Sequence, residues 1–172
     1  MRNLYLFYTL ICLVSCKAKS KLATEVAQEV RPFICPDNGS CSFEVLKNTD
    51  LIVKTDHLGS VYTEVVEGPG AVLKFEYKKQ GKTDYEDSGY REEIFMALNL
   101  DQLDIETENL KEEKLFFARW CYCKGQTGYY KMSQGKLKIA KLDDKTIQLH
   151  LNFEMEEVPQ IIKEINHTFS LE

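Results

Sequence analysis

The chain has 172 residues, of which 44% are hydrophobic, and its 22 basic and 27 acidic residues leave a net charge of −5. This apolar fraction excludes a disordered chain, and the length suits one folded domain. An acidic chain without a basic stripe lacks the electrostatic footprint of a nucleic-acid-binding protein, so we expect no nucleic-acid partner.

The first fifteen residues have the layout of a secretory signal peptide. Arg2 supplies a positive charge, residues 4–14 form an apolar run, and the small residue Ser15 precedes Cys16. The run is shorter than the roughly 20 residues that a membrane-spanning helix needs, which favours a cleaved signal over residues 1–15. The sequence LVSC, ending at Cys16, resembles the lipobox of bacterial lipoproteins, and the resemblance implies that this cysteine becomes the lipidated N-terminus. The alternative is a plain signal peptide followed by a chance cysteine.

The lipobox resemblance also implies a location. Each buried CH₂ of an acyl chain contributes about 0.8 kcal/mol, so several chains on Cys16 would hold the protein to a membrane without a spanning helix. Lys17 follows the cysteine where an aspartate would imply retention at an inner membrane. We therefore expect a lipid anchor in the outer membrane, on its periplasmic face. Residues 16–31 are expected to form the lipidated N-terminus and a polar tether, and residues 32–172 a single β-rich domain.

Alternation of apolar and polar residues dominates the rest of the chain. Ile147, Leu149, Leu151 and Phe153 alternate strictly with polar residues, which predicts a half-buried strand over residues 146–154. Similar patterns predict strands at 71–78, 94–98, 137–139, 115–123 and, less cleanly, 161–171. The segment 115–123 is apolar on both faces, as in a central strand covered on both sides. The pattern predicts an all-β domain, an antiparallel sandwich or barrel of roughly eight strands with at most one short helix.

The one segment that departs from alternation is 99–114. It carries six acidic residues, and Leu100, Leu103 and Leu110 recur at near-helical spacing. A surface loop with a short helix is the expectation, its charge being a solvated face.

Four cysteines follow Cys16, and an exported compartment permits disulfides between them: Cys35, Cys41, Cys121 and Cys123. In a strand, Cys121 and Cys123 would face the same side with Cα atoms about 7 Å apart, at the limit for bridging each other. Two long-range bridges to the CPDNGSC loop are therefore favoured, with a local Cys35–Cys41 bridge as the main rival. A zinc site and a redox-active dithiol are weaker alternatives, because their usual spacings are C-x₂₋₄-C and C-x-x-C.

Catalytic signatures are absent from the sequence. His57, His150 and His167 form no metal-binding or triad pattern, and Glu92 and Glu93, adjacent in a strand, would point to opposite faces. The segment beginning at Asp84 imitates the front of an EF-hand loop, but its twelfth position is Phe95. We therefore assign no catalytic residue, metal or cofactor, and an enzyme is the less favoured reading.

Aromatic residues gather around one predicted hairpin, whose turn 124–128 is rich in glycine. Trp120, Tyr122, Tyr129 and Tyr130 are the candidate binding surface, although aromatic residues are common in strands and packing within the hairpin is the alternative.

The motifs LVSC, CPDNGSC and CYCKGQTGYYK, followed by the closing TIQLHLNF strand, resemble small lipoproteins of the Bacteroidota. This resemblance implies no activity. The expected function is a lipid-anchored, non-enzymatic binding module that meets a protein or glycan of the cell envelope. The alternative is an envelope enzyme or thiol-redox factor with a site assembled from non-adjacent residues.

Overall fold

The structure is a computed structural model that describes residues 33–79 and 89–171. The expected signal peptide, Cys16, the tether and the segment 80–88, which contains Asp84, lie outside the described residues. The described chain forms strands and no helix, and thus none that is long and apolar enough to cross a membrane. The strands are β1 (Ser40–Thr55), β2 (Val61–Lys79), β3 (Tyr90–Leu98), β4 (Ile105–Thr107), β5 (Leu115–Trp120), β6 (Gly128–Lys131), β7 (Gln134–Lys141), β8 (Thr146–Glu154) and β9 (Glu164–Ser170).

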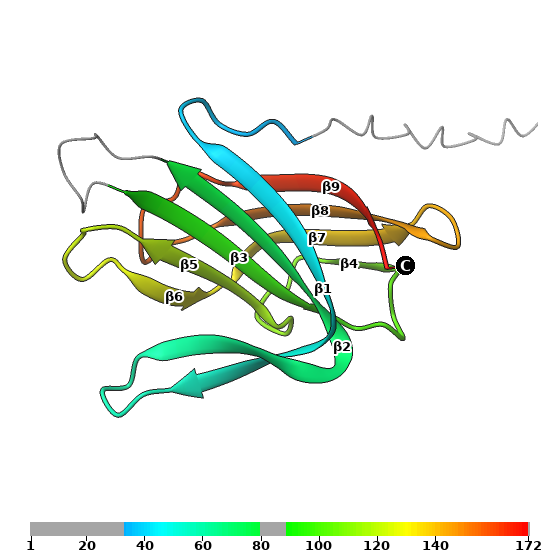
Figure 1. The fold of residues 1–172 in the computed structure, drawn as a ribbon, viewed down its shortest axis with the longest axis horizontal. Coiled ribbons are helices and arrows are strands. Elements are labelled where there is room, and N and C mark those ends of the chain that lie inside the picture. Colours follow the sequence, from blue (N-terminus) through cyan, green and yellow to red (C-terminus); the bar gives the residue numbers. More distant parts are fainter. Residues whose placement is uncertain (1–32, 80–88, 172) are drawn as a thin grey trace, which may run out of the picture.

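These strands form two antiparallel sheets that lie on each other as the layers of a sandwich (Figure 1). The first sheet has the order β1-β2-β3-β5-β6 and the second the order β4-β7-β8-β9. Their inner faces meet in one apolar core, in which the rings of Phe117 from the first sheet and Phe153 from the second lie 6.0 Å apart. The predicted all-β antiparallel sandwich is confirmed.

The strictest alternation in the sequence, at residues 146–154, forms the strand β8. Along β8, Ile147, Leu149, Leu151 and Phe153 are buried in the core while the residues between them are more exposed. The turn before it is fixed by Asp143, whose Oδ1 accepts hydrogen bonds of 2.8 Å from the backbone N–H groups of Lys145 and Thr146. These bonds stabilise the ionised carboxylate and lower the pKa of Asp143.

The segment 99–114 forms the strand β4 and turns rather than the expected short helix. Ile105 pairs with Ile139 of β7, so β4 forms the edge of the second sheet. Leu103 and Leu110 are buried in the core, while the acidic residues Glu106 and Glu112 face solvent. These two buried leucines lie on either side of the strand β4. Their spacing resembles that of one helical face, and periodicity alone cannot distinguish the two arrangements.

The hairpin of β1 and β2 is bent in the middle, a feature that the sequence patterns did not predict. The register shifts between Lys47 and Thr49, and Asn48 takes a positive φ of 55°. On the opposing strand, a Cβ at Gly68 would lie 2.1 Å from Oδ2 of Asp50, so the close approach there requires glycine. A bulge with a glycine opposite it bends both strands.

Because of this bend, the far half of the hairpin, residues 49–67, turns back beneath the first sheet near β6 (Figure 1). We call this segment the arm. Leu51 and Val65 of the arm join Phe95, Phe116 and Ala118 in a second apolar cluster on the outer face of that sheet. The arm therefore explains why β5 is apolar on both sides, as expected of a doubly covered strand.

All four described cysteines are disulfide-bonded, but not in the favoured arrangement. The bridges are Cys35–Cys41 and Cys121–Cys123, with Cα–Cα distances of 5.8 Å and 5.2 Å. The long-range pairing was wrong because β1 and β5 are three strand positions apart, about 14 Å, beyond the reach of a disulfide. In addition, β5 ends at Trp120, so the second pair lies in a turn that brings its Cα atoms closer than an extended strand would.

Candidate binding surface

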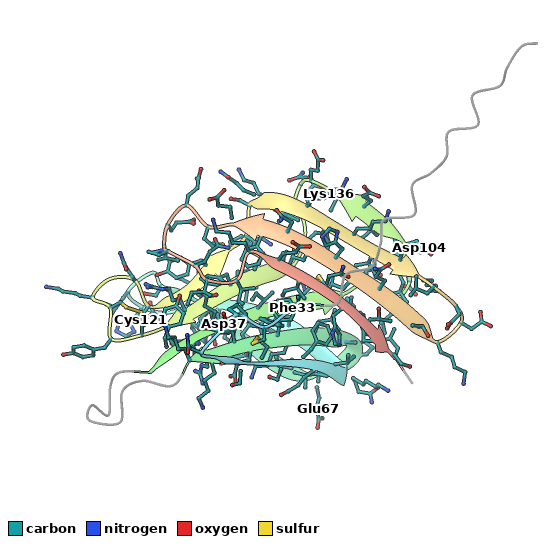
Figure 2. All side chains as sticks on the ribbon, turned by 90° about the horizontal axis from the view of Figure 1, so that it is seen from above. Phe33, Asp37, Glu67, Asp104, Cys121 and Lys136 are labelled. Atoms are coloured by element: carbon teal, nitrogen blue, oxygen red, sulfur yellow. A yellow bond between two sulfur atoms is a disulfide. The ribbon has the colours of Figure 1, made fainter. Side chains whose placement is uncertain are left out.

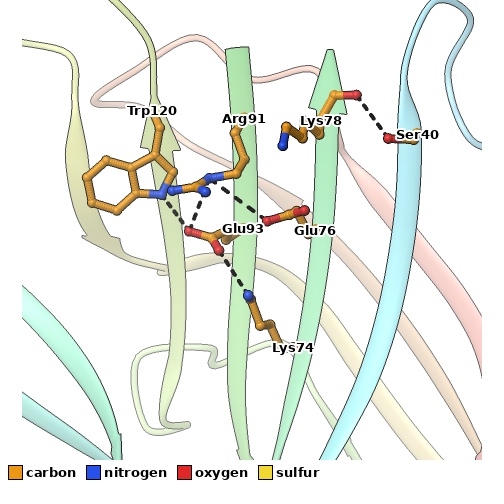
Figure 3. A network of polar contacts seen from close by, with 7 residues as sticks. All are labelled: Ser40, Lys74, Glu76, Lys78, Arg91, Glu93 and Trp120. Atoms are coloured by element: carbon orange, nitrogen blue, oxygen red, sulfur yellow. Dashed lines mark hydrogen bonds and ion pairs between the residues drawn. The ribbon is translucent and has the colours of Figure 1, made fainter. Parts of the chain in front are cut away.

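The single tryptophan of the chain, Trp120, is held in place on the outer face of the first sheet. Its Nε1–H donates a hydrogen bond of 2.5 Å to Oε2 of Glu93, which is 6% exposed and lies 3.2 Å from Nζ of Lys74 (Figure 3). The ring of Tyr129 meets the indole edge-on at 5.3 Å. The tryptophan therefore has a fixed orientation at the end of β5.

Arg91 lies beside this ring and links it to the neighbouring strands (Figure 3). Its guanidinium carbon is 5.6 Å from the centre of the Trp120 ring, a cation–π distance. Its Nε lies 3.6 Å from Glu93 and 3.9 Å from Glu76. The register of the paired strands explains why these side chains meet, because Arg91 is opposite Trp120 on one side and Lys78 on the other.

The turn after Trp120 projects a second aromatic ring into solvent. Cys121 and Cys123 are joined to each other, and Tyr122 between them is 88% exposed. Thr127 closes the turn, since its hydroxyl donates to the carbonyl of Cys121 at 2.9 Å. Figure 2 shows Cys121 at one end of the molecule, with Asp104 toward the opposite end.

A pocket of about 350 Å³ opens at this end of the sandwich. Three cationic and three aromatic residues line it, together with Gly89 and Cys121. The cations are Lys78, Lys79 and Arg91, and the aromatic residues are Tyr90, Trp120 and Tyr122. A concave surface with a few polar groups at fixed positions is the usual form of a small-ligand site.

Of the four predicted surface residues, the structure brings together only some. Trp120 and Tyr122 line the pocket, while Tyr129 supports the indole from the outer face. Tyr130 points to the inner face and packs against Phe117, because neighbouring strand residues face opposite sides. Sequence reasoning missed Lys78, Lys79, Tyr90 and Arg91. These residues meet Trp120 only through the register of β2, β3 and β5, which the sequence patterns do not specify.

Behind the pocket, a polar network on the inner face supports the turn. Tyr90 donates a hydrogen bond to the buried Glu92 and accepts one of 3.2 Å from Arg119. Nη1 of Arg119 in turn donates to the backbone carbonyl and the side-chain oxygen of Gln126, both at 3.1 Å. Burial, followed by the hydrogen bond to Glu92, raises the pKa of Tyr90 to about 12, so this hydroxyl is a donor and not a base at neutral pH.

A second, more apolar pocket of about 500 Å³ lies between β1 and β9. Phe33, Phe43 and Phe75 line it beside the Cys35–Cys41 bridge and His167. The imidazole of His167 lies 4.1 Å from the ring of Phe43, and burial lowers its pKa. The described residues that line this pocket include no carboxylate.

The three histidines lie in separate places: His57 in the turn of the arm, His150 on the outer face of the second sheet beside Glu164, and His167 in the apolar pocket. Within residues 33–79 and 89–171, no group of three metal-ligating side chains comes together. No protein-family model, curated protein or solved structure matches the chain.

Proposed function

We propose that the protein is a lipid-anchored lipoprotein of the cell envelope whose β-sandwich serves as a non-enzymatic binding module. The observation that carries this proposal is the Trp120–Tyr122 end of the molecule. There a large aromatic side chain, Tyr122, is almost fully exposed on a turn that is closed by a disulfide and by Thr127. Exposed aromatic residues are typical of binding surfaces, because a tyrosine supplies a large contact area while only two side-chain torsions are fixed on association.

The residues that surround Trp120 favour a binding role for this surface over a role in packing. Trp120 is fixed by Glu93, Arg91 and Tyr129, so the surface is formed before any ligand arrives. The surrounding charges keep the pocket accessible to water rather than closing it as a core.

Anchoring is the second part of the proposal, and it is supported by the sequence of the first sixteen residues. A lipid on Cys16 would hold the domain at the periplasmic face of the outer membrane, with residues 17–31 as a tether. The binding module would then meet proteins or glycans of the envelope.

The anchor is tested with a clickable palmitate analogue fed to cells that express the full chain. We expect label in the wild-type protein and its recovery with outer membranes, and neither in a Cys16→Ser variant. Label that persists in C16S, or a wild-type protein recovered without membranes, would contradict the anchor.

The binding surface is tested by placing a photo-cross-linking amino acid at position 122 in intact cells. The matched control is position 142, because Leu142 is also exposed, at 54%, in the turn before β8. We expect defined cross-linked products from position 122 only. Equal products from both positions, or none from either, would contradict a binding role for this end.

A thiol-redox role is the second candidate, favoured by the bridge between Cys121 and Cys123 in an exposed turn. It closes a loop of only three residues, so in the chain-entropy model it constrains the unfolded chain far less than a long-range bridge would. Alkylation of free thiols in growing cells decides between the two. A substantial reduced fraction at these cysteines would favour redox exchange, and full oxidation would favour the binding module.

A further inference from the structure

We propose that the pocket at the Trp120 end binds an acidic sugar residue, such as a uronic acid, within an envelope glycan. The ligand's carboxylate would lie against Lys78 and Arg91, which face each other across β2 and β3, with Lys79 adding charge nearby, and its ring would lie against Tyr122. This inference rests on the proposed binding function and specifies its ligand.

Charge is the first argument. Among residues 33–79 and 89–171, those that line the pocket include three cations and no carboxylate, although the chain as a whole is acidic. Among the described residues, no carboxylate lies within ion-pair distance of the ammonium groups of Lys78 and Lys79. A local positive site on an acidic protein attracts an anionic ligand and repels a cationic one.

The arrangement of Arg91 indicates what kind of anion fits. Glu93 and Glu76 approach the guanidinium on its Nε side, at 3.6 Å and 3.9 Å. The described residues accept no hydrogen bond from its two Nη groups, which remain available to a ligand. A planar guanidinium pairs well with a planar carboxylate, and the flanking lysines add charge without demanding a fixed geometry.

The aromatic residues indicate that the anion is carried on a ring. Arg91 covers one side of the Trp120 indole, which leaves Tyr122 as the open aromatic face of the site. The face of an aromatic ring is electron-rich, so the polarised C–H groups of a sugar ring pack favourably against it. A carboxylate and a C–H face on one small ring are the features of a uronic acid.

Size separates this ligand from a protein partner. The pocket is shallow and open, and its volume of about 350 Å³ suits one or two sugar residues that remain partly exposed to solvent. A protein partner needs about 800 Å² on each side, and lysine is depleted at the centre of such interfaces. Two lysines in a small concave site therefore favour the glycan.

The test measures binding to the full-length lipoprotein in detergent, with the fluorescence of the single tryptophan as the signal. The probes are a glucuronate-containing tetrasaccharide, the neutral tetra-N-acetylchitotetraose, glucose 6-phosphate, and mixed detergent micelles that contain phosphatidylglycerol. We expect saturable binding of the acidic tetrasaccharide, at least about tenfold tighter than that of the neutral one, and weakening with added salt.

Variants assign the binding to this pocket. Lys78→Gln combined with Lys79→Gln, and separately Tyr122→Ala, should each weaken binding by about tenfold or more. Lys136→Gln, an exposed lysine on the other sheet, is the matched control and should leave the affinity unchanged. Circular dichroism establishes that each variant is folded before its affinity is interpreted.

The outcomes separate this inference from the proposed function. Equal binding of neutral and acidic tetrasaccharides, no binding of either, or tighter binding of the phosphate or of the phosphatidylglycerol micelles would overturn the acidic-sugar ligand. If position 122 nevertheless cross-links to an envelope protein, the binding module stands with a different partner. If both assays fail, both proposals fail.

Discussion

Two neighbouring carboxylates on β3 have opposite roles in this molecule. Glu92 points to the inner face and is fully buried, where its two oxygens accept hydrogen bonds of 2.6 Å and 2.8 Å from the backbone N–H groups of Ile161 and Ile162. Glu93 points to the outer face and accepts a hydrogen bond from the indole of Trp120.

The difference lies in which part of the chain supplies the donors. Ile161 and Ile162 belong to the connection between β8 and β9, so Glu92 ties the first sheet to the second. The donors to Glu93 are side chains of its own sheet, Trp120 and Lys74. The inner carboxylate therefore serves the stability of the sandwich, and the outer one the shape of its binding surface.

The largest effect is expected from Glu92→Ala. Two backbone N–H groups and the hydroxyl of Tyr90 would lose their acceptor in a buried place, at about 1–3 kcal/mol for each unsatisfied group. We expect the free energy of unfolding to fall by about 3–5 kcal/mol, measured by urea denaturation followed by circular dichroism.

Glu92→Gln is the matched comparison for this prediction. It keeps the volume and one acceptor but points an amide NH₂ at groups that are themselves donors, so its loss should be smaller, about 1–3 kcal/mol. A Glu92→Ala variant as stable as the wild type would show that the two sheets are joined by packing alone.

Glu93→Ala should have a smaller effect on stability, about 1–2 kcal/mol, and a clear effect on Trp120. Without its acceptor, the indole Nε1–H would hydrogen-bond to water, and the emission of the only tryptophan should shift to longer wavelength. Glu93→Gln keeps an acceptor and should retain most of the wild-type emission. Identical spectra for the wild type and Glu93→Ala would contradict the assigned role of Glu93.

Strand alternation alone anticipated this division between the two glutamates. Residues one apart in a strand face opposite sides, so Glu92 and Glu93 were expected to separate, and they do. The same rule predicted the buried side of β8 and the doubly covered β5. The same rule separates Tyr129 from Tyr130, because these neighbours in β6 face opposite sides and cannot belong to one surface.

The alternation of apolar and polar residues does not predict features that depend on contacts between residues distant in the sequence. The arm depends on a bulge at Asn48 that faces Gly68 across the hairpin, and neither residue alone indicates a bend. The disulfide pairing depends on the order of strands within the sheet, which places β1 and β5 too far apart to bridge. The cations of the pocket come from the ends of two strands whose register the sequence does not specify.

The pH dependence of the stability of a Tyr90→Phe variant tests the polar network on the inner face. The pKa of Tyr90 is about 12 in the folded protein and about 10 in an unfolded chain, so folding favours the protonated hydroxyl. That contribution is fully present below pH 10 and is lost as the pH rises toward 12. Tyr90→Phe cannot ionise, so we expect its stability to fall less steeply than that of the wild type over this interval. Parallel stability curves would contradict the raised pKa of Tyr90 in the folded protein.

The smallest effect is expected from Glu106→Gln, which tests whether burial rather than charge gives the two β3 glutamates their roles. Glu106 also meets two cations, with Nζ of Lys136 at 2.5 Å and that of Lys138 at 3.2 Å, and both lower its pKa. All three side chains are nearly half exposed, so water screens the ion pairs in the folded state and solvates the charges in the unfolded one. We therefore expect no measurable shift of the urea midpoint at neutral pH, even though Glu106 has as many charged partners as Glu93. A shift as large as that of Glu93→Ala would mean that the number of charged partners, and not their removal from water, determines what a carboxylate contributes to this sandwich.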